Sequence, residues 1–233
     1  SEKSINMSYV IAYNRPWYNS FAKNLERKIG SDFYSINNKH DLNKDHLLKI
    51  NPRYIFFPHW SHIIPKDIYN QYECIIFHMT DLPYGRGGSP LQNLIIEGHK
   101  QTVISAIKCV EEIDAGPIYI KESLSLEGTA EEIFIRSSKI IEEMICNFIN
   151  EQPKPKPQKG KIVKFVRRKP EQSNLINAKT FDQIFDYIRM LDAQGYPKAY
   201  VKLGKYKFTF SKASKNGKYI DANVKISKEN END

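Results

Sequence analysis

The chain has 233 residues, enough to bury one substantial core and to carry a second, smaller domain. Its 35 Lys and Arg against 27 Asp and Glu give a net charge of +8, which favours anionic partners such as nucleotides, polyglutamylated cofactors or nucleic acid, although a merely soluble basic surface explains it equally well. No leader-like segment and no long apolar run is present, so we expect a cytoplasmic protein without a signal peptide or membrane span.

The first half of the chain alternates short apolar runs with helix-like segments. Residues 9–13 form the first run, and an amphipathic stretch with Phe21 and Leu25 at helical spacing follows before Gly30. Similar runs recur at 54–57, 74–77, 103–107 and 118–120, and residues 41–50 have the pattern of a helix. This order predicts an α/β, Rossmann-like domain with a mostly parallel sheet.

The second half begins with a long helix and then changes character. A capping box at 129–132 opens the helix, which closes a catalytic domain that we place at residues 1–150. Alternating prolines and lysines predict an extended, poorly packed linker over 151–166. A small α+β module is expected over 167–227, with a helix from Phe181 and a hairpin at Asn216-Gly217, followed by a disordered tail over 228–233.

The three cysteines lie apart from one another, each within an apolar run. Cys74, Cys109 and Cys146 therefore read as small buried hydrophobic residues of a protein in a reducing compartment.

The most informative segment is residues 77–93, FHMTDLPYGRGGSPLQN. An apolar strand delivers His78 at its carboxyl end, and a loop rich in Gly and Pro follows directly. Ligands of open α/β sheets bind at such strand ends, and a histidine there can act as a general acid or base. A structural histidine at a strand end is the alternative, and for the residue taken alone it is the commoner case.

A second segment places a carboxylate after another strand. Asp114 opens an Asp-Ala-Gly-Pro turn, which we expect at the same edge of the sheet as His78. A carboxylate in that position can orient and charge an imidazole, as in other His-Asp pairs. An ordinary Asp-x-Gly turn is the alternative, and it is far commoner.

Taken together, the two segments resemble the methionyl-tRNA formyltransferase-like superfamily and, within it, the sugar N-formyltransferases, most of all those of pseudaminic-acid-type pathways. The superfamily has a His-x-Ser/Thr-x-Leu-Pro pattern with Arg-Gly and Pro-x-Gln after it, and an Asp-x-Gly element 36 positions beyond the histidine, where Asp114 stands. The pattern is matched by His78, Thr80, Leu82, Pro83, Arg86, Gly87, Pro90 and Gln92. The resemblance covers most of residues 54–210 and implies a folate-dependent N-formyltransferase with His78 and Asp114 as catalytic residues.

The resemblance also implies N10-formyltetrahydrofolate as the formyl donor, held between two loops. The residues assigned to it are His62, Ile63 and Ile64 in one loop, and Val110, Glu111, Glu112, Ile113 and Asp114 in the other. An apolar wall suits a flat pterin, and backbone groups near Val110 can pair with its polar edge. The pair His59 and His62 lacks further matching ligands, so we expect no metal.

One position departs from the family pattern. The family has an asparagine two residues before the histidine, where it stabilises the tetrahedral intermediate, and this chain has Ile76. Such donors are worth roughly two to three powers of ten in rate. We therefore assign the role to Thr80, to a backbone N–H or to a protonated His78, and a catalytically weakened folate- or nucleotide-binding homologue stays as an alternative.

The acceptor is expected to bind after the first strand. Arg15, Trp17 and Tyr18 combine a cation with aromatic faces, which suits a base, sugar or phosphate, and Arg86 of the glycine-rich loop is assigned to the same site. The alternative is a helix that starts at Pro16 with Trp17 packed inward.

We predict that the acceptor is a nucleotide-linked amino sugar. We expect no membrane partner and do not expect a nucleic acid as the partner, and a homodimer is an open alternative to a monomer. Methionyl-tRNA formylation is the runner-up, because the basic charge favours it while the small C-terminal module does not look like a full tRNA-binding domain. Glycinamide ribonucleotide formylation is a third option.

Overall fold

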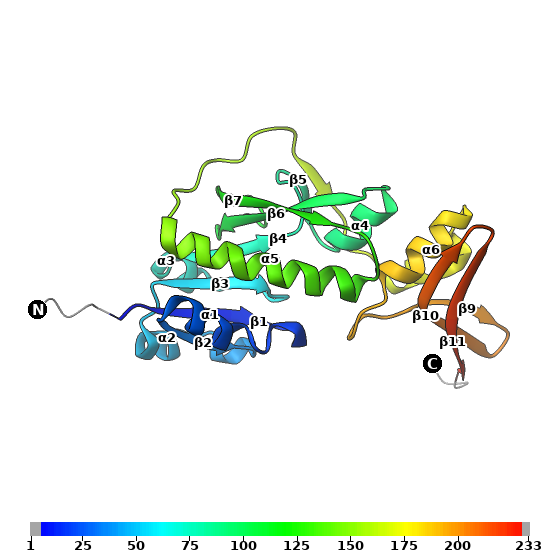
Figure 1. Cartoon of the computed structure of the whole chain (residues 1–233), viewed down its shortest axis with the longest axis horizontal. Helices are drawn as coiled ribbons and strands as arrows, with labels where there is room; N and C mark the ends of the chain where they lie inside the picture. Colours follow the sequence, from blue (N-terminus) through cyan, green and yellow to red (C-terminus); the bar gives the residue numbers. More distant parts are fainter. Residues whose placement is uncertain (1–5, 230–233) are drawn as a thin grey trace, which may run out of the picture. The chain divides into compact units, whose positions relative to one another are not determined.

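The computed structural model describes residues 6–229, and Figure 1 shows their arrangement. The chain divides into two compact units. The first comprises the chain up to Arg86 together with Val103–Leu124 and Ile135–Lys164, and the second comprises Gly87–Thr102, Ser125–Phe134 and the chain from Phe165 onward. No helix among residues 6–229 is both long and apolar enough to cross a bilayer.

A six-stranded sheet forms the centre of the first unit, in the order β2-β1-β3-β4-β6-β7. Its strands are β1 (Ser8–Tyr13), β2 (Asp32–Ile36), β3 (Tyr54–His59), β4 (Cys74–His78), β6 (Gln101–Lys108) and β7 (Ile118–Ser125). The pairs β1–β2, β1–β3 and β3–β4 are parallel, so the predicted Rossmann-like, mostly parallel sheet is confirmed. Strand β6 runs antiparallel to β4, and its direction could not be predicted because a buried apolar run has the same pattern in both directions.

The helices follow the predicted apolar patterns. In α1, Phe21 and Leu25 are buried, and Gly30 ends the helix in the left-handed conformation that glycine adopts without strain. The capping box at the start of α5 forms, since the Glu132 N–H donates to the Thr129 hydroxyl and that hydroxyl contacts the Glu132 carboxylate. The helices are α1 (Phe21–Ile29), α2 (Lys44–Ile50), α3 (Lys66–Gln71), α4 (Pro90–Ile96), α5 (Ala130–Glu151) and α6 (Phe181–Met190).

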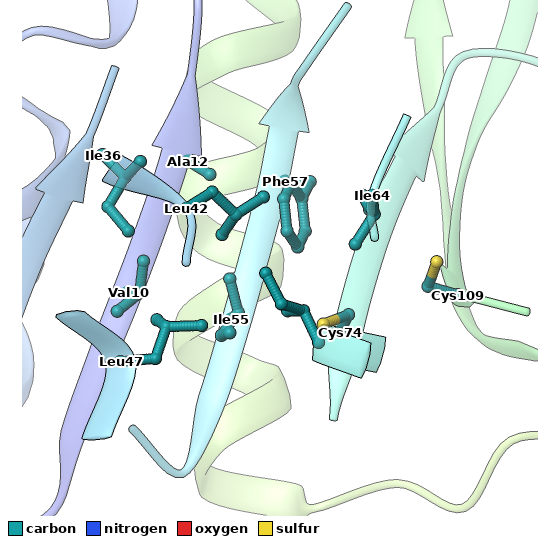
Figure 2. Close-up of a cluster of buried hydrophobic side chains, with 11 residues drawn as sticks. Val10, Ala12, Ile36, Leu42, Leu47, Ile55, Phe57, Ile64, Cys74 and Cys109 are labelled. Carbon is teal, nitrogen blue, oxygen red and sulfur yellow. The ribbon is translucent and has the colours of Figure 1, made fainter. Parts of the chain in front are cut away.

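Hydrophobic side chains cover both faces of the sheet in the first unit. On the face under α5, the ring of Phe148 packs edge-on against Tyr54, Phe56 and Tyr119. Figure 2 shows a second cluster on the opposite face, which includes Phe57 and Ile64. Each fully buried side chain of this size contributes roughly 1.5–3 kcal/mol to folding.

The cysteines are largely buried, as the sequence predicts. Cys74 and Cys109 belong to the cluster of Figure 2, whereas Cys146 is partly exposed. Burial raises the pKa of Cys109 to about 11, so its side chain stays an uncharged thiol at neutral pH.

The segment predicted to be a loose linker is instead hydrogen-bonded to the first unit. The backbone of Lys156 exchanges two hydrogen bonds with Ile118, at 2.7 and 2.9 Å. Further on, β8 (Val163–Phe165) pairs with β5 (Tyr84–Gly87), and the Val163 N–H donates to the Pro83 carbonyl at 3.1 Å. An extended, proline-rich chain can still use the N–H and C=O groups of its other residues, and this one uses them.

The second unit contains a three-stranded antiparallel sheet in the order β11-β10-β9. The strands are β9 (Ala199–Leu203), β10 (Tyr206–Asn216) and β11 (Tyr219–Lys228). The predicted hairpin turn is present, with Asn216 paired to Tyr219 and Gly217 at a φ of 58°. Of the tail predicted to be disordered, Lys228 lies in β11 and the Glu229 N–H bonds to Lys205, while residues 230–233 lie outside the described residues.

Candidate active site

His78 lies at the carboxyl end of β4 and is 9 % exposed. Its Nε2 is 2.8 Å from the carbonyl oxygen of Gly85. A carbonyl oxygen can only accept, so Nε2 must carry a proton and donate it. The other ring nitrogen, Nδ1, is 3.7 Å from Oδ1 of Asp114. The predicted pair of His78 and Asp114 therefore forms, and Gly85 determines which nitrogen faces the carboxylate.

Asp114 reaches His78 by a different route from the one expected. Because β6 is antiparallel to β4, the end of β6 lies beside the start of β4, and the loop after Cys109 runs back to the carboxyl end of β4, where Asp114 meets His78. Asp114 has a φ of 57°, an uncommon value for a residue with a side chain. A Cβ at Gly116 would lie 1.7 Å from the Lys108 carbonyl oxygen, so this turn requires glycine.

Gln158 is a site residue that the sequence did not reveal. Its Nε2 donates to the carbonyl oxygens of Asp114 and Gly116, both at 2.8 Å, and its Oε1 accepts two hydrogen bonds from Arg86. One amide thus connects the glycine-rich loop to the Asp114 turn. Only its position beside a run of Pro and Lys is visible in the sequence, and that pattern predicts a linker.

Arg86 is predicted to bind the acceptor, but in the structure its guanidinium contacts other residues of the protein. It is 8 % exposed, and besides the two bonds to Gln158 its Nη1 is 3.7 Å from the Glu112 carboxylate. Since its charge faces Gln158 and Glu112, the geometry supports a role in positioning the two loops rather than in binding the acceptor.

Thr80 also forms hydrogen bonds within the protein. Its side chain is fully buried, and its hydroxyl donates to the Gly85 carbonyl at 3.1 Å, the same oxygen that His78 contacts. The Ser105 hydroxyl donates in turn to the Thr80 carbonyl at 2.7 Å. The geometry therefore does not support Thr80 as an oxyanion donor, and its observed contact helps to hold the oxygen that orients His78. Ile76, two residues earlier on β4, packs against the apolar cluster of Figure 2 and supplies no polar group.

Each of the two loops predicted to hold the folate is anchored by a residue of the same apolar cluster. Ile64 and Cys109 are members of it, and Figure 2 shows them side by side on one face of the sheet. Next to these anchors, Ile63 is 87 % exposed and Ile113 is 68 % exposed. Exposed apolar side chains on these two loops offer a surface that a flat aromatic co-substrate can cover, so these residues fit the group.

The predicted acceptor loop divides into buried and accessible residues. Pro16 starts a short 3-10 helix (Pro16–Tyr18), and Tyr18 is 1 % exposed, packed edge-on against Phe21 at a ring distance of 5.1 Å. Tyr18 is therefore a core residue, which corrects its assignment to the acceptor. Trp17 and Arg15 are partly exposed, and Trp17 lies 6.1 Å from the ring of His59.

His59 is a partly buried histidine at the carboxyl end of β3. Burial, reinforced by the neighbouring Arg15 cation, lowers the pKa of His59 to about 3, so the ring is neutral at physiological pH. Within residues 6–229, no three His, Cys, Asp or Glu side chains gather in a way that could hold a metal ion.

Two family models match the chain. Residues 15–145 match the model described as "Formyl transferase", and residues 170–227 match "Methionyl-tRNA formyltransferase, C-terminal domain". The methionyl-tRNA formyltransferase of Bacillus velezensis is 30 % identical over 166 residues, which are 67 % of this chain and 52 % of the relative. The chain thus spans about half the length of the curated relatives that it matches.

Solved structures give the same fold. A structure described as a methionyl-tRNA formyltransferase from Clostridium thermocellum is 48 % identical, covers 95 % of this chain and 99 % of its own, and has a TM-score of 0.92. A sugar N-formyltransferase from Shewanella sp. is 17 % identical, covers 91 % of this chain and 99 % of its own, and has a TM-score of 0.68. At that identity the second likeness concerns the fold alone.

These matches correct the predicted acceptor and confirm the predicted class. The nucleotide-linked amino sugar and the exclusion of nucleic acid were wrong, because the relatives of higher identity are methionyl-tRNA formyltransferases. The C-terminal module, judged too small for such a protein, matches a C-terminal domain of that description. The glycine-rich loop variant therefore did not distinguish sugar from tRNA relatives. With a family model covering residues 15–145, the chain belongs to the formyl transferase family.

Proposed function

We propose that this chain transfers a formyl group from N10-formyltetrahydrofolate to the amino group of methionyl-tRNA. The observation that carries the chemistry is the orientation of His78, whose Nε2 donates to Gly85 and whose Nδ1 faces Asp114. The family match and the relatives support the reaction class and the acceptor.

In this mechanism, His78 is the general base that accepts the proton lost by the amine. With Nε2 bonded to Gly85, a neutral His78 presents the lone pair of Nδ1 as the proton acceptor. The negative charge of Asp114, on the side of the same nitrogen, then stabilises the imidazolium that forms. The 3.7 Å separation is longer than a hydrogen bond, and such contacts commonly tighten when substrate is bound.

When bound, the folate would supply the formyl group, and protonated His78 would return the amine's proton to the leaving N10. His62, Ile63 and Ile64 line one side of its site, and the loop from Val110 to Asp114, including Glu111, Glu112 and Ile113, lines the other. Ile76 is apolar, the Thr80 hydroxyl is bonded to Gly85, and both ring nitrogens of His78 face other groups, so we assign oxyanion stabilisation to a backbone N–H of these loops.

The acceptor assignment gains physical support from one face of the second unit. Residues 199–228 contain eight lysines and a single acidic residue, Asp221. The strand register places Lys202, Lys207 and Lys225 on one face with Tyr200, and Lys207 Nζ lies 4.5 Å from the centre of the Tyr200 ring. We call this surface, defined by these four residues, the lysine face. Lysines beside an aromatic ring suit phosphates and bases, and the charge itself provides salt-dependent affinity.

The test is a formyl-transfer assay with radiolabelled N10-formyltetrahydrofolate and three acceptors, methionyl-tRNA, free methionine and glycinamide ribonucleotide. We expect formylated methionyl-tRNA as the product, lost in the His78→Ala variant. Formylation of free methionine at the same rate would refute an RNA acceptor. Formylation of glycinamide ribonucleotide alone would replace the proposed acceptor, and no product from any of them would support a binding homologue instead.

A further inference from the structure

An open pocket lies beside the loop proposed to hold the folate. Its volume is about 350 Å³, at the lower end for small-molecule sites, and it is in the first unit. Lys39, His40, Trp60 and His62 line it, and buried Leu42 contributes an apolar surface. Figure 2 shows Leu42 and Ile64 on either side of Phe57. Cys109, from which the second proposed folate loop starts, lies on the same face of the sheet.

Hydrogen bonds fix the backbone that carries Lys39 and His40, two of the polar residues of this pocket. Asn38 accepts a hydrogen bond from the His40 N–H at 2.9 Å, and the Asn43 side chain donates to the His40 carbonyl at 2.8 Å. The two caps fix the short 3-10 helix (Lys39–Asp41) that carries both lining residues. Among residues 6–229, no carboxylate forms an ion pair with Lys39.

The shape and chemistry of the pocket suit a charged chain better than a ring. Lys39, His40 and His62 are all exposed, so a ligand here keeps contact with water. An ammonium and two imidazoles offer donors to oxygen acceptors, and the indole of Trp60 offers an apolar side to a methylene chain. His62 and Ile63 belong both to this pocket and to the proposed folate loop. A ligand that leaves the folate loop on this side therefore enters the pocket directly.

We propose that this pocket binds the γ-linked glutamate carboxylates of a polyglutamylated folate, with Lys39 as the main cationic contact. The inference rests on the proposed folate-dependent function. If the pocket binds the tail, a folate with more glutamates binds the protein more tightly than a folate with one.

The experiment measures binding of tetrahydrofolate mono- and triglutamate by calorimetry at low salt, without an acceptor. The wild type should bind the triglutamate about tenfold more tightly, the effect of one charge-assisted contact. Lys39→Gln should remove most of that preference and leave monoglutamate affinity nearly unchanged. Lys49→Gln, in the last turn of α2 and also exposed, should keep the preference.

The outcomes separate the two proposals. Equal affinities of the wild type for both folates, or an intact preference in Lys39→Gln, would overturn the tail site while leaving the folate site standing. Failure to bind either folate would refute the proposed function itself. Lys39-dependent binding of ATP, with no effect of tail length, would show that the pocket takes a nucleotide phosphate and would also overturn the assignment.

Discussion

The loops around His78 and the lysine face of the second unit use polar side chains in opposite ways. Around His78, the polar groups are buried or partly buried and each has an assigned partner: Thr80 and Arg86 are buried, and Gln158 is partly buried. On the lysine face, Lys207 and Lys225 form no ion pair within the described part of the chain. Buried, mutually bonded groups keep a fixed geometry, which suits chemistry, whereas exposed charges adapt to a polyanion. Changes in the two regions should therefore affect different kinetic quantities.

The largest expected effect is on turnover at the His78 centre. His78→Ala and Asp114→Asn should each lower kcat by roughly three powers of ten or more, and the double variant should be little worse than either, because the two residues act as one unit. Single-turnover assays measure this directly. Turnover close to the wild type in either single variant, with tetrahydrofolate binding intact, would exclude the pair as the catalytic centre.

A smaller loss of turnover is expected from Gln158→Leu. Without the amide, the Asp114 turn loses two hydrogen bonds and Arg86 loses its partner, and a displacement of about 1 Å can cost about a hundredfold in rate. We expect kcat to fall between tenfold and a hundredfold, with little change in either KM.

Gln158→Glu sharpens this test, because the carboxylate keeps the contact with Arg86 but cannot donate to the turn. It should therefore resemble Gln158→Leu in kcat. Gln152→Leu, in the same proline-rich segment, is the matched control and should behave as the wild type. If Gln158→Glu retained full turnover, the bonds to the Asp114 turn would not be what positions the carboxylate.

On the lysine face, the expected effect is on acceptor binding. The double variant Lys207→Gln, Lys225→Gln should raise the KM for methionyl-tRNA by about tenfold and leave kcat unchanged, since two phosphate contacts are lost. The salt dependence of log KM should also become shallower. Lys23→Gln with Lys49→Gln removes the same charge from the first unit and should change neither value. Equal effects of the two double variants would mean that net charge, rather than the lysine face, attracts the RNA.

The smallest effect expected is on stability and comes from His59. Its folded pKa of about 3 lies below the ordinary value of 6.5, so between these pH values the unfolded chain binds more protons and the fold loses stability as the pH falls. The loss is at most about 1.4 kcal/mol per pH unit. Urea unfolding at pH 7 and pH 5 should show a smaller difference for His59→Gln than for the wild type. His40→Gln, an exposed histidine, should keep the full difference.

The sequence was most informative where a local pattern determines the structure. The helix with Phe21 and Leu25, the capping box at Thr129 and the turn at Gly217 could all be predicted because each depends on neighbouring residues. The proximity of His78 and Asp114 was also predicted, although through a parallel strand that is antiparallel in the structure.

The remaining site contacts could not be predicted, since they depend on residues far apart in the chain. Gln158 meets the Asp114 turn next to the point where Lys156 pairs with Ile118 at the start of β7, and the proline pattern gives no sign of that pairing. Strand β9 was missed because its five residues lack a clear apolar alternation. The acceptor was misassigned because the glycine-rich loop chemistry is common to relatives with different acceptors.

The hydrogen bonds around His78 also differ in the number of residues that separate their two partners along the chain. The bonds from Thr80 and His78 to Gly85 span 5 and 7 residues, so they can form as soon as the loop does. The bonds of Gln158 span 44 residues to Asp114 and 72 to Arg86, and closing such loops carries a larger entropic cost. We therefore expect the contacts that orient the histidine to form earlier in folding than the contacts that hold its aspartate.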